Sequence, residues 1–167
     1  MRRTLTALAA AIAAVIVPHH ELAAQSSSAS LSVTANVQKN CTITTSPIAF
    51  GGYDPVAGNA TAPLDGIGTV IVTCTKGAVA HVGLNEGSNN QGNTRRMRQS
   101  GTAFLTYEIY KDSARTDRWG DDIGSNLDLG AAPNRNPRTF TAYGRIPAAQ
   151  DATVGNYVDT VVATVQF

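Results

Sequence analysis

The sequence is poor in the residues that most often perform catalysis or bind metal ions. Its 167 residues include only three histidines, two cysteines and one tryptophan. Two of the histidines, His19 and His20, lie in an N-terminal stretch that we expect to be removed, so that only His81 remains. His81 lies in a strand-like stretch, where a packing or surface role is typical, and no nucleophile–base pair, carboxylate pair or metal cluster accompanies it. The sequence therefore predicts a protein that is not an enzyme and that has no metal ion or cofactor.

Long apolar runs are also scarce. The run Leu5–Val17 carries no charge, but it is shorter than the roughly 20 apolar residues that cross a bilayer. It follows Arg2 and Arg3 and precedes a short polar stretch that ends in two alanines, the second of which is Ala24. This order of segments predicts a secretory signal peptide over residues 1–24, cleaved after Ala24. Its removal leaves 143 residues, a size typical of one domain.

The sequence also lacks a large excess of positive or negative charge. Removal of the leader takes away two arginines and Glu21 and leaves 11 basic and 11 acidic residues, which argues against nucleic acid as a partner.

The stretch Arg95–Arg98 could bind phosphate, but it lacks interleaved aromatic residues, and we interpret the polar segment 86–101 around it as a loop or hairpin tip. A second irregular segment, 112–137, contains acidic residues whose spacing does not match a calcium-binding loop. We interpret these as members of a solvated loop: Asp112, Asp117, Asp121, Asp122 and Asp128.

The two cysteines, Cys41 and Cys74, have a simple interpretation in an exported chain. An isolated pair of cysteines in an oxidising compartment most simply forms one disulfide bond. A metal site would need more ligands than these two thiols and His81 can provide.

Helical periodicity is almost absent after the leader. Short runs rich in β-branched and aromatic residues recur instead, separated by glycine, asparagine, aspartate and proline. Many short strands with turn signals between them indicate an all-β sandwich. The runs with strand character are residues 31–38, 41–51, 68–74, 79–87, 104–112, 140–147 and 156–167.

The first and the last of these runs are unusual because they lie at the two ends of the chain. The segment 31–38 alternates apolar and polar residues behind a serine-rich leader, and the segment 157–167 alternates up to the last residue. Either could be an ordinary strand of the domain's own sheets. Alternatively, an extended segment can add itself as a strand to the open sheet of another subunit, with backbone hydrogen bonds for affinity and alternate side chains in pockets.

Four stretches, taken together, resemble the spore coat protein U domain family, which includes subunits of the archaic, Csu-type chaperone–usher pili. They are FGGYDP (50–55), GTVIVTCT (68–75), YEIYKDSARTDRWG (107–120) and FTAYGRIPAAQDATVGNYVDTVVATVQF (140–167). The resemblance implies an incomplete immunoglobulin-like β-sandwich that lacks its final strand. It also implies three kinds of partner: a periplasmic chaperone that supplies this strand first, an outer-membrane usher, and copies of the chain itself in a homopolymeric fibre.

The resemblance assigns roles to individual residues. It implies an N-terminal donor segment over residues 25–38, a pilin-like domain over 39–167, and a disulfide between Cys41 and Cys74. The donor side chains would be Leu31, Val33, Ala35 and Val37. The C-terminal strand would line the acceptor groove and bind the chaperone, whose basic residues would hold the terminal carboxylate. Both faces of this strand carry valines, and we expect the inward face to be Val161, Ala163, Val165 and Phe167.

Three functions remain as alternatives at this point. The first is a pilus subunit, secreted through the periplasm and polymerised by donor-strand exchange on the cell surface, which serves attachment and biofilm formation. The second is a self-contained carbohydrate-binding or adhesin β-sandwich, which should fold as a stable monomer. The third is a spore-coat-type surface component with the same fold at another location.

Overall fold

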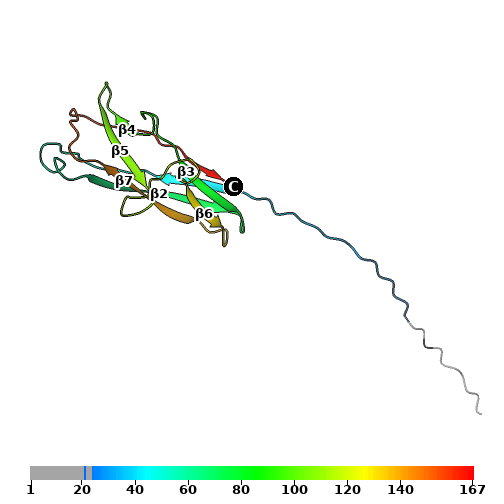
Figure 1. Ribbon diagram of the computed structural model, residues 1–167. Coiled ribbons are helices and arrows are strands. Elements are labelled where there is room, and N and C mark those ends of the chain that lie inside the picture. Colours follow the sequence, from blue (N-terminus) through cyan, green and yellow to red (C-terminus); the bar gives the residue numbers. More distant parts are fainter. Residues whose placement is uncertain (1–20, 22–23) are drawn as a thin grey trace, which may run out of the picture. The chain divides into compact units, whose positions relative to one another are not determined.

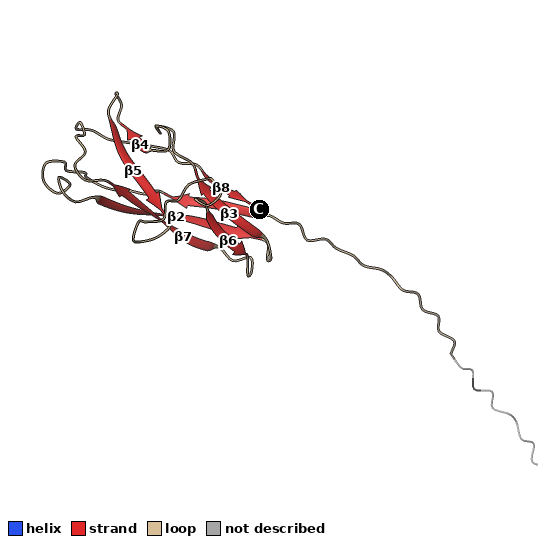
Figure 2. Cartoon of the chain, in the orientation of Figure 1, coloured by secondary structure: helices blue, strands red, loops and turns tan. Residues whose placement is uncertain are grey.

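The computed structural model describes Glu21 and residues 24–167, and the regular structure of these residues consists of β-strands (Figures 1 and 2). The chain divides into two compact units, residues 1–35 and 36–167. The signal peptide predicted for residues 1–24 lies almost entirely outside the described residues and stays a prediction. No helix in the described part of the chain is long and apolar enough to span a membrane.

The alternating segment 31–38 is not a strand of the domain's own sheets. Residues 24–40 have no regular secondary structure, and all of them are exposed. The apolar side chains Leu31 and Val33 are 87% and 86% exposed. The apolar side chains of this alternating segment are therefore exposed to solvent.

Residues 36–167 contain two antiparallel sheets that face each other. The larger sheet has the strand order β1–β2–β7–β5–β4 and the smaller sheet has the order β6–β3–β8. The strands of the larger sheet are β1 (Cys41–Ser46), β2 (Leu64–Cys74), β7 (Arg138–Ile146), β5 (Phe104–Tyr110) and β4 (Arg95–Arg98). Those of the smaller sheet are β6 (Leu127–Ala131), β3 (Val79–Leu84) and β8 (Ala163–Gln166). The all-β sandwich expected from the sequence is confirmed.

The hydrophobic core lies between the two sheets and follows from period-two alternation. On β2, Val70, Val72 and Cys74 are buried, whereas the residues between them are partly exposed. Trp119 is fully buried in the same core, and its indole N–H donates a hydrogen bond to the Val82 carbonyl at 2.9 Å. The single tryptophan therefore ties the irregular segment after β5 to the centre of β3.

The disulfide between Cys41 and Cys74 is present, as predicted. The two residues are direct partners in the register of β1 and β2, at the first residue of β1 and the last of β2. The bond therefore closes the end of this strand pair.

The segment 86–101, which we interpreted as a loop or hairpin tip, contains a strand, and so does the irregular segment 112–137, which is long enough to contain a short one. The prediction of a loop at Arg95–Arg98 is wrong, because these residues form β4 and pair with β5. Arg95 can be fully buried because its guanidinium pairs with the Glu108 carboxylate and donates hydrogen bonds to backbone carbonyls. In the segment 112–137, five residues form β6, which places the half-buried Leu127 and Leu129 against the core.

Candidate functional site

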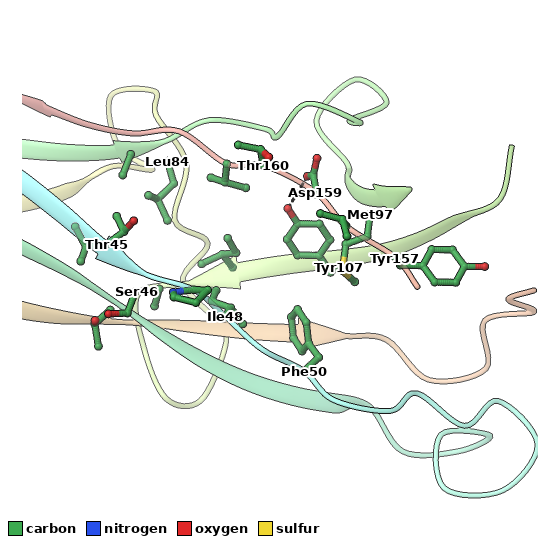
Figure 3. A pocket seen from close by; sticks show the side chains of 18 residues that line it. Thr45, Ser46, Ile48, Phe50, Leu84, Met97, Tyr107, Tyr157, Asp159 and Thr160 are labelled. Atoms are coloured by element: carbon green, nitrogen blue, oxygen red, sulfur yellow. Dashed lines mark hydrogen bonds between the residues drawn. The ribbon is translucent and has the colours of Figure 1, made fainter. Parts of the chain in front are cut away.

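An apolar groove of about 410 Å³ runs between the chain that leaves β1 and the C-terminal segment (Figure 3). One wall consists of residues 45–50, and the other consists of residues 157–161 together with Ala163 of β8. The floor comes from five strands and consists of Val70, Leu84, Met97, Tyr107, Ile109 and Ala142. The groove thus opens the hydrophobic core to solvent along one side of the sandwich.

A second hollow, of about 530 Å³, continues this groove toward the loops that follow it. The two hollows share Ile48, Phe50, Met97 and Tyr157. The second one is bounded by residues 48–55 on one side and by 152–157 on the other. Together they form one continuous groove, bordered by residues 45–55 and 152–163, which we call the acceptor groove.

Glycines beneath the groove allow one of its walls to enter the sandwich. A Cβ atom added at Gly68 of β2 would lie 2.7 Å from Ile48 Cγ1, and one added at Gly144 of β7 would lie 2.6 Å from Phe50 Cζ. Such distances are shorter than carbon atoms tolerate. The missing side chains therefore let Ile48 and Phe50 lie directly on the sheet, where the Phe50 ring meets the Tyr107 ring edge-on with centroids 6.2 Å apart.

Both walls of the acceptor groove have an open backbone edge. In the described part of the chain, β1 pairs only with β2, and β8 only with β3. In the segment before β8, every second residue accepts a backbone hydrogen bond on its carbonyl oxygen. The Arg98 N–H donates to the Val158 carbonyl, the Ser88 N–H to the Thr160 carbonyl, and the Asn85 N–H to the Val162 carbonyl. Among the described residues, no backbone hydrogen bond reaches the intervening Asp159 and Val161. An edge of unpaired N–H and C=O groups beside an apolar groove is a template for another strand.

A partly buried hydrogen-bond cluster fixes the C-terminal wall. The Tyr107 hydroxyl donates to Asp159 Oδ2 at 2.7 Å (Figure 3). The Asn89 backbone and side-chain amides donate to Asp159 Oδ1 at 3.1 and 2.9 Å. Burial, and then the bond to Asp159, raise the pKa of Tyr107 well above its ordinary value. The phenol therefore remains a neutral donor, and the wall is held to β5.

We expect Tyr107→Phe to lower the free energy of unfolding near neutral pH by about 1.5–3 kcal/mol, the range for hydrogen bonds to charged groups. A tyrosine whose pKa is raised on folding stabilises the protein fully below its ordinary pKa, and this contribution is lost as pH rises further. Above about pH 10, the difference in free energy of unfolding between the native protein and Tyr107→Phe should shrink by up to about 1.4 kcal/mol per pH unit. Urea unfolding of both proteins between pH 7 and pH 11 checks this, and a pH-independent difference would contradict it.

The structure places the predicted site residues in two different environments. Val161, Ala163 and Val165 are half-buried and pack against the core, whereas Phe167 is 47% exposed. The four predicted donor side chains are all exposed, in a segment without regular structure. Sequence reasoning did not identify the wall and floor residues Ile48, Phe50, Tyr107 and Asp159, although Ile48 and Phe50 lie two residues apart within the run 41–51.

The acidic loop has internal partners. One oxygen of Asp112 accepts the backbone N–H groups of Thr116 and Asp117, and the other accepts the Thr116 hydroxyl. The bond from the Asp117 backbone is the main cause that lowers the pKa of Asp112. Among the described residues, no group of three or more histidine, cysteine, aspartate or glutamate side chains is arranged to hold a metal ion.

The sequence model of the Spore Coat Protein U domain matches residues 27–164, which is most of the chain. The chain belongs to this family. A relative in the Spore Coat Protein U domain family, "Protein U" of Myxococcus xanthus, is 36% identical over 182 aligned residues that cover the full length of both chains. The family resemblance inferred from the four sequence stretches is thus confirmed.

A solved structure with the same kind of fold comes from the chaperone–tip adhesion subunit pre-assembly complex of the archaic chaperone–usher Csu pili of Acinetobacter baumannii. The match has a TM-score of 0.58 and 26% identity, and it covers 78% of this chain. This Spore Coat Protein U domain protein spans about 40% of the length of the matched chain. The sandwich is therefore similar to that of a pilin-like chaperone–usher protein.

Proposed function

We propose that the protein is a structural subunit of an archaic chaperone–usher pilus, polymerised by donor-strand exchange. The observation that carries the proposal is the acceptor groove with its unpaired backbone edge, in a chain that also presents an exposed alternating segment. In the proposed fibre, the segment 25–38 of one subunit lies in the acceptor groove of the domain 39–167 of the next. The family and the fold support this assignment.

The donor segment and the groove match in chemistry, since both present apolar side chains. From Leu31 to Val37 an extended chain spans about 20 Å, since a strand rises about 3.3 Å per residue. Its four apolar side chains lie on one face, so they enter the groove together while the polar face stays outside. Each larger side chain that is buried contributes about 1.5–3 kcal/mol, and each added backbone hydrogen bond about 1 kcal/mol. Such a contact dissociates very slowly.

The same groove requires a partner before polymerisation. A domain with an open apolar core is prone to aggregate, so we propose that a periplasmic chaperone occupies the groove first and that an outer-membrane usher directs the exchange. The A. baumannii complex, which joins a chaperone to a subunit before assembly, supports this order. The assembled fibre would lie on the cell surface and serve attachment and biofilm formation.

The test is a gel of the exported protein in SDS, with and without boiling, after co-expression with the chaperone from the same gene cluster. We expect a ladder of polymers that collapses on boiling to one band of about 143 residues, the size after removal of the leader. A single monomer band in both lanes, from protein that is soluble without a chaperone, would indicate a complete sandwich and refute the proposal.

A matched pair of variants tests the donor segment. Val33→Asp places a carboxylate on the apolar face of the segment and should abolish the ladder, because burying an unpaired charge is very costly. Ser32→Asp adds the same charge one residue earlier, on the polar face, and should leave the ladder intact. Equal ladders from both variants would contradict the assignment of residues 31–37 as the donor.

A surface-coat component is the second candidate, and the full-length similarity to Protein U in the Spore Coat Protein U domain family favours it. It would use the same fold and the same groove, so the gel does not separate it from a pilus subunit. Immunogold labelling of intact cells does separate them: label along filaments indicates a pilus, and label confined to a continuous layer indicates a coat.

A further inference from the structure

A hydrogen bond holds Gln38, the last residue of the donor segment, to the domain. The Thr75 hydroxyl donates to the Gln38 carbonyl at 3.2 Å, and the Asn40 N–H donates to Thr75 Oγ1 at 3.2 Å. The Thr75 N–H in turn donates to the Asn40 carbonyl at 2.9 Å. The chain is therefore bound to the domain from residue 38 onward. A donor segment whose last apolar side chain is Val37 therefore brings the end of its own domain into contact with the subunit that receives it.

Exposed lysine and arginine side chains gather at the end of the domain that carries the donor segment, where the terminal carboxylate of Phe167 also lies because Gln166 pairs with His81. The register pairs Cys41 with Cys74, Val72 with Arg138 and Val79 with Ala131, so the segments 39–41, 74–79 and 131–138 meet at one end, which we call the base. These three segments contain no aspartate or glutamate. Their exposed cations are Lys39, Lys76 and Arg135, and none of the three forms an ion pair within the described residues.

The opposite end of the acceptor groove carries the opposite charge. The pairing of Leu64 with Ile146 places the loops 51–63 and 147–156 together there, and we call them the far end. The loops are joined by hydrogen bonds from Ala149 N–H to the Asn59 carbonyl and from the Tyr53 hydroxyl to the Pro147 carbonyl, both 2.9 Å. They contain no lysine or arginine, and their exposed charges are Asp54 and Asp151.

The cations beside the far end have partners of their own. Arg145 and Arg115 both pair with Asp65, next to the pair of Leu64 and Ile146. The Arg98 guanidinium donates to the Gly101 carbonyl at 3.0 Å and lies 6.0 Å from the centre of the Phe104 ring. It is thus directed along its own hairpin, whereas the two loops that border the groove present only carboxylates.

We propose that the base of one subunit docks on the far end of the next, with Lys39, Lys76 and Arg135 facing Asp54 and Asp151. This inference rests on the proposed donor-strand exchange and adds a second, electrostatic contact to it. The alternative, in which the donor leaves the groove at the base end, would bring two positive bases together. Like charges in contact repel, and a base-to-base contact is self-complementary and closes as a dimer, whereas a base-to-far-end contact continues as a filament.

The contact should set the angle between neighbouring subunits and hence the stiffness of the fibre. Surface ion pairs are screened by salt, and the Debye length falls from about 20 Å to about 4 Å between about 20 mM and about 500 mM NaCl. We expect the persistence length of native fibres, measured from electron micrographs, to fall at least about twofold over this range. The heat-labile ladder in SDS should be unchanged, because the donor strand itself stays buried.

Charge reversal at the two ends tests the pairing. Asp54→Lys with Asp151→Lys, and separately Lys76→Glu with Arg135→Glu, should make fibres flexible at low salt. All four substitutions in one chain restore opposite charges and should restore stiffness. Asp121→Lys with Asp122→Lys, on an exposed loop outside both ends, is the matched control and should behave as the native protein.

The outcomes separate this inference from the proposed function. A normal ladder with a persistence length that neither salt nor charge reversal changes would overturn the docking contact alone. Loss of stiffness in the reversed variants without recovery in the fourfold variant would also overturn it. Absence of a heat-labile ladder from the native protein would overturn both.

Discussion

Replacing Arg95 with methionine is expected to lower the free energy of unfolding by about 3–5 kcal/mol, the usual cost of breaking a buried ion pair. The guanidinium is fully buried and pairs with Glu108. It also donates to the carbonyls of Leu84 at 2.7 Å, Asn85 at 2.8 Å and Trp119 at 2.8 Å. Methionine fills a similar volume, so the loss comes from the acceptors that are left unpaired, and not from a cavity.

Losing these hydrogen bonds should also weaken the C-terminal wall of the acceptor groove. Asn85, which Arg95 holds, donates its N–H to the Val162 carbonyl at 3.1 Å and accepts the Val162 N–H on its side-chain oxygen at 2.9 Å. Arg95 therefore supports the C-terminal wall of the groove through one intervening residue. We expect Arg95→Met to expose the amides of residues 158–162 to hydrogen exchange before the protein unfolds globally.

The neighbouring arginine provides the control. Arg96 lies on the same strand with its guanidinium 4.0 Å from the centre of the Phe104 ring, where such a contact is worth about 0.5–1 kcal/mol. Arg96→Met should therefore cost about 1 kcal/mol. Urea unfolding of both variants and the native protein gives the two differences. If the two variants lose the same free energy, the buried network around Arg95 does not carry the stability assigned to it.

Removing the disulfide should have an effect of similar size. Cys41 and Cys74 close a loop 33 residues apart in sequence, and the chain-entropy estimate for such a loop is about 4 kcal/mol. We expect Cys41→Ser with Cys74→Ser to lose this amount in urea unfolding, because the unfolded chain gains freedom. The native protein should lose the same amount when a thiol reductant is added.

The reductant also provides the control for this prediction. The double serine variant has no bond left to reduce, so its unfolding midpoint should not change with reductant. A native protein whose midpoint is insensitive to reductant, under conditions where mass spectrometry shows both thiols free, would contradict the entropic role of the bond.

The strands with the clearest period-two alternation were predictable from sequence. β2, β3, β5 and β7 all fall on runs that the sequence identified, because their alternating residues face a core on one side only. β4 was not predictable in this way, since RRMR has the composition of a polar loop. The partners that bury Arg95, above all Glu108 and the carbonyls of Leu84 and Trp119, come from other strands and segments, and their proximity depends on the tertiary fold.

The candidate site was predictable only in part, for a similar reason. The two terminal segments could be singled out because their alternation is visible locally. The groove itself depends on Gly68 and Gly144, which lie on different strands and make room for Ile48 and Phe50. A glycine within a strand suggests close approach of another group. It does not indicate which group approaches, and that requires the arrangement of the sheets.

The disulfide at the end of β1 has a mechanical consequence. In the proposed fibre under tension, the pull on each domain would enter through residues 38–40 and reach the first residue of β1. An edge strand pulled at its end would otherwise peel off, one pair of hydrogen bonds at a time. The bond from Cys41 to Cys74 passes the force directly to β2, which has β1 on one side and β7 on the other. The load is then shared across the centre of the sheet, where the hydrogen bonds of two strand pairs must break together.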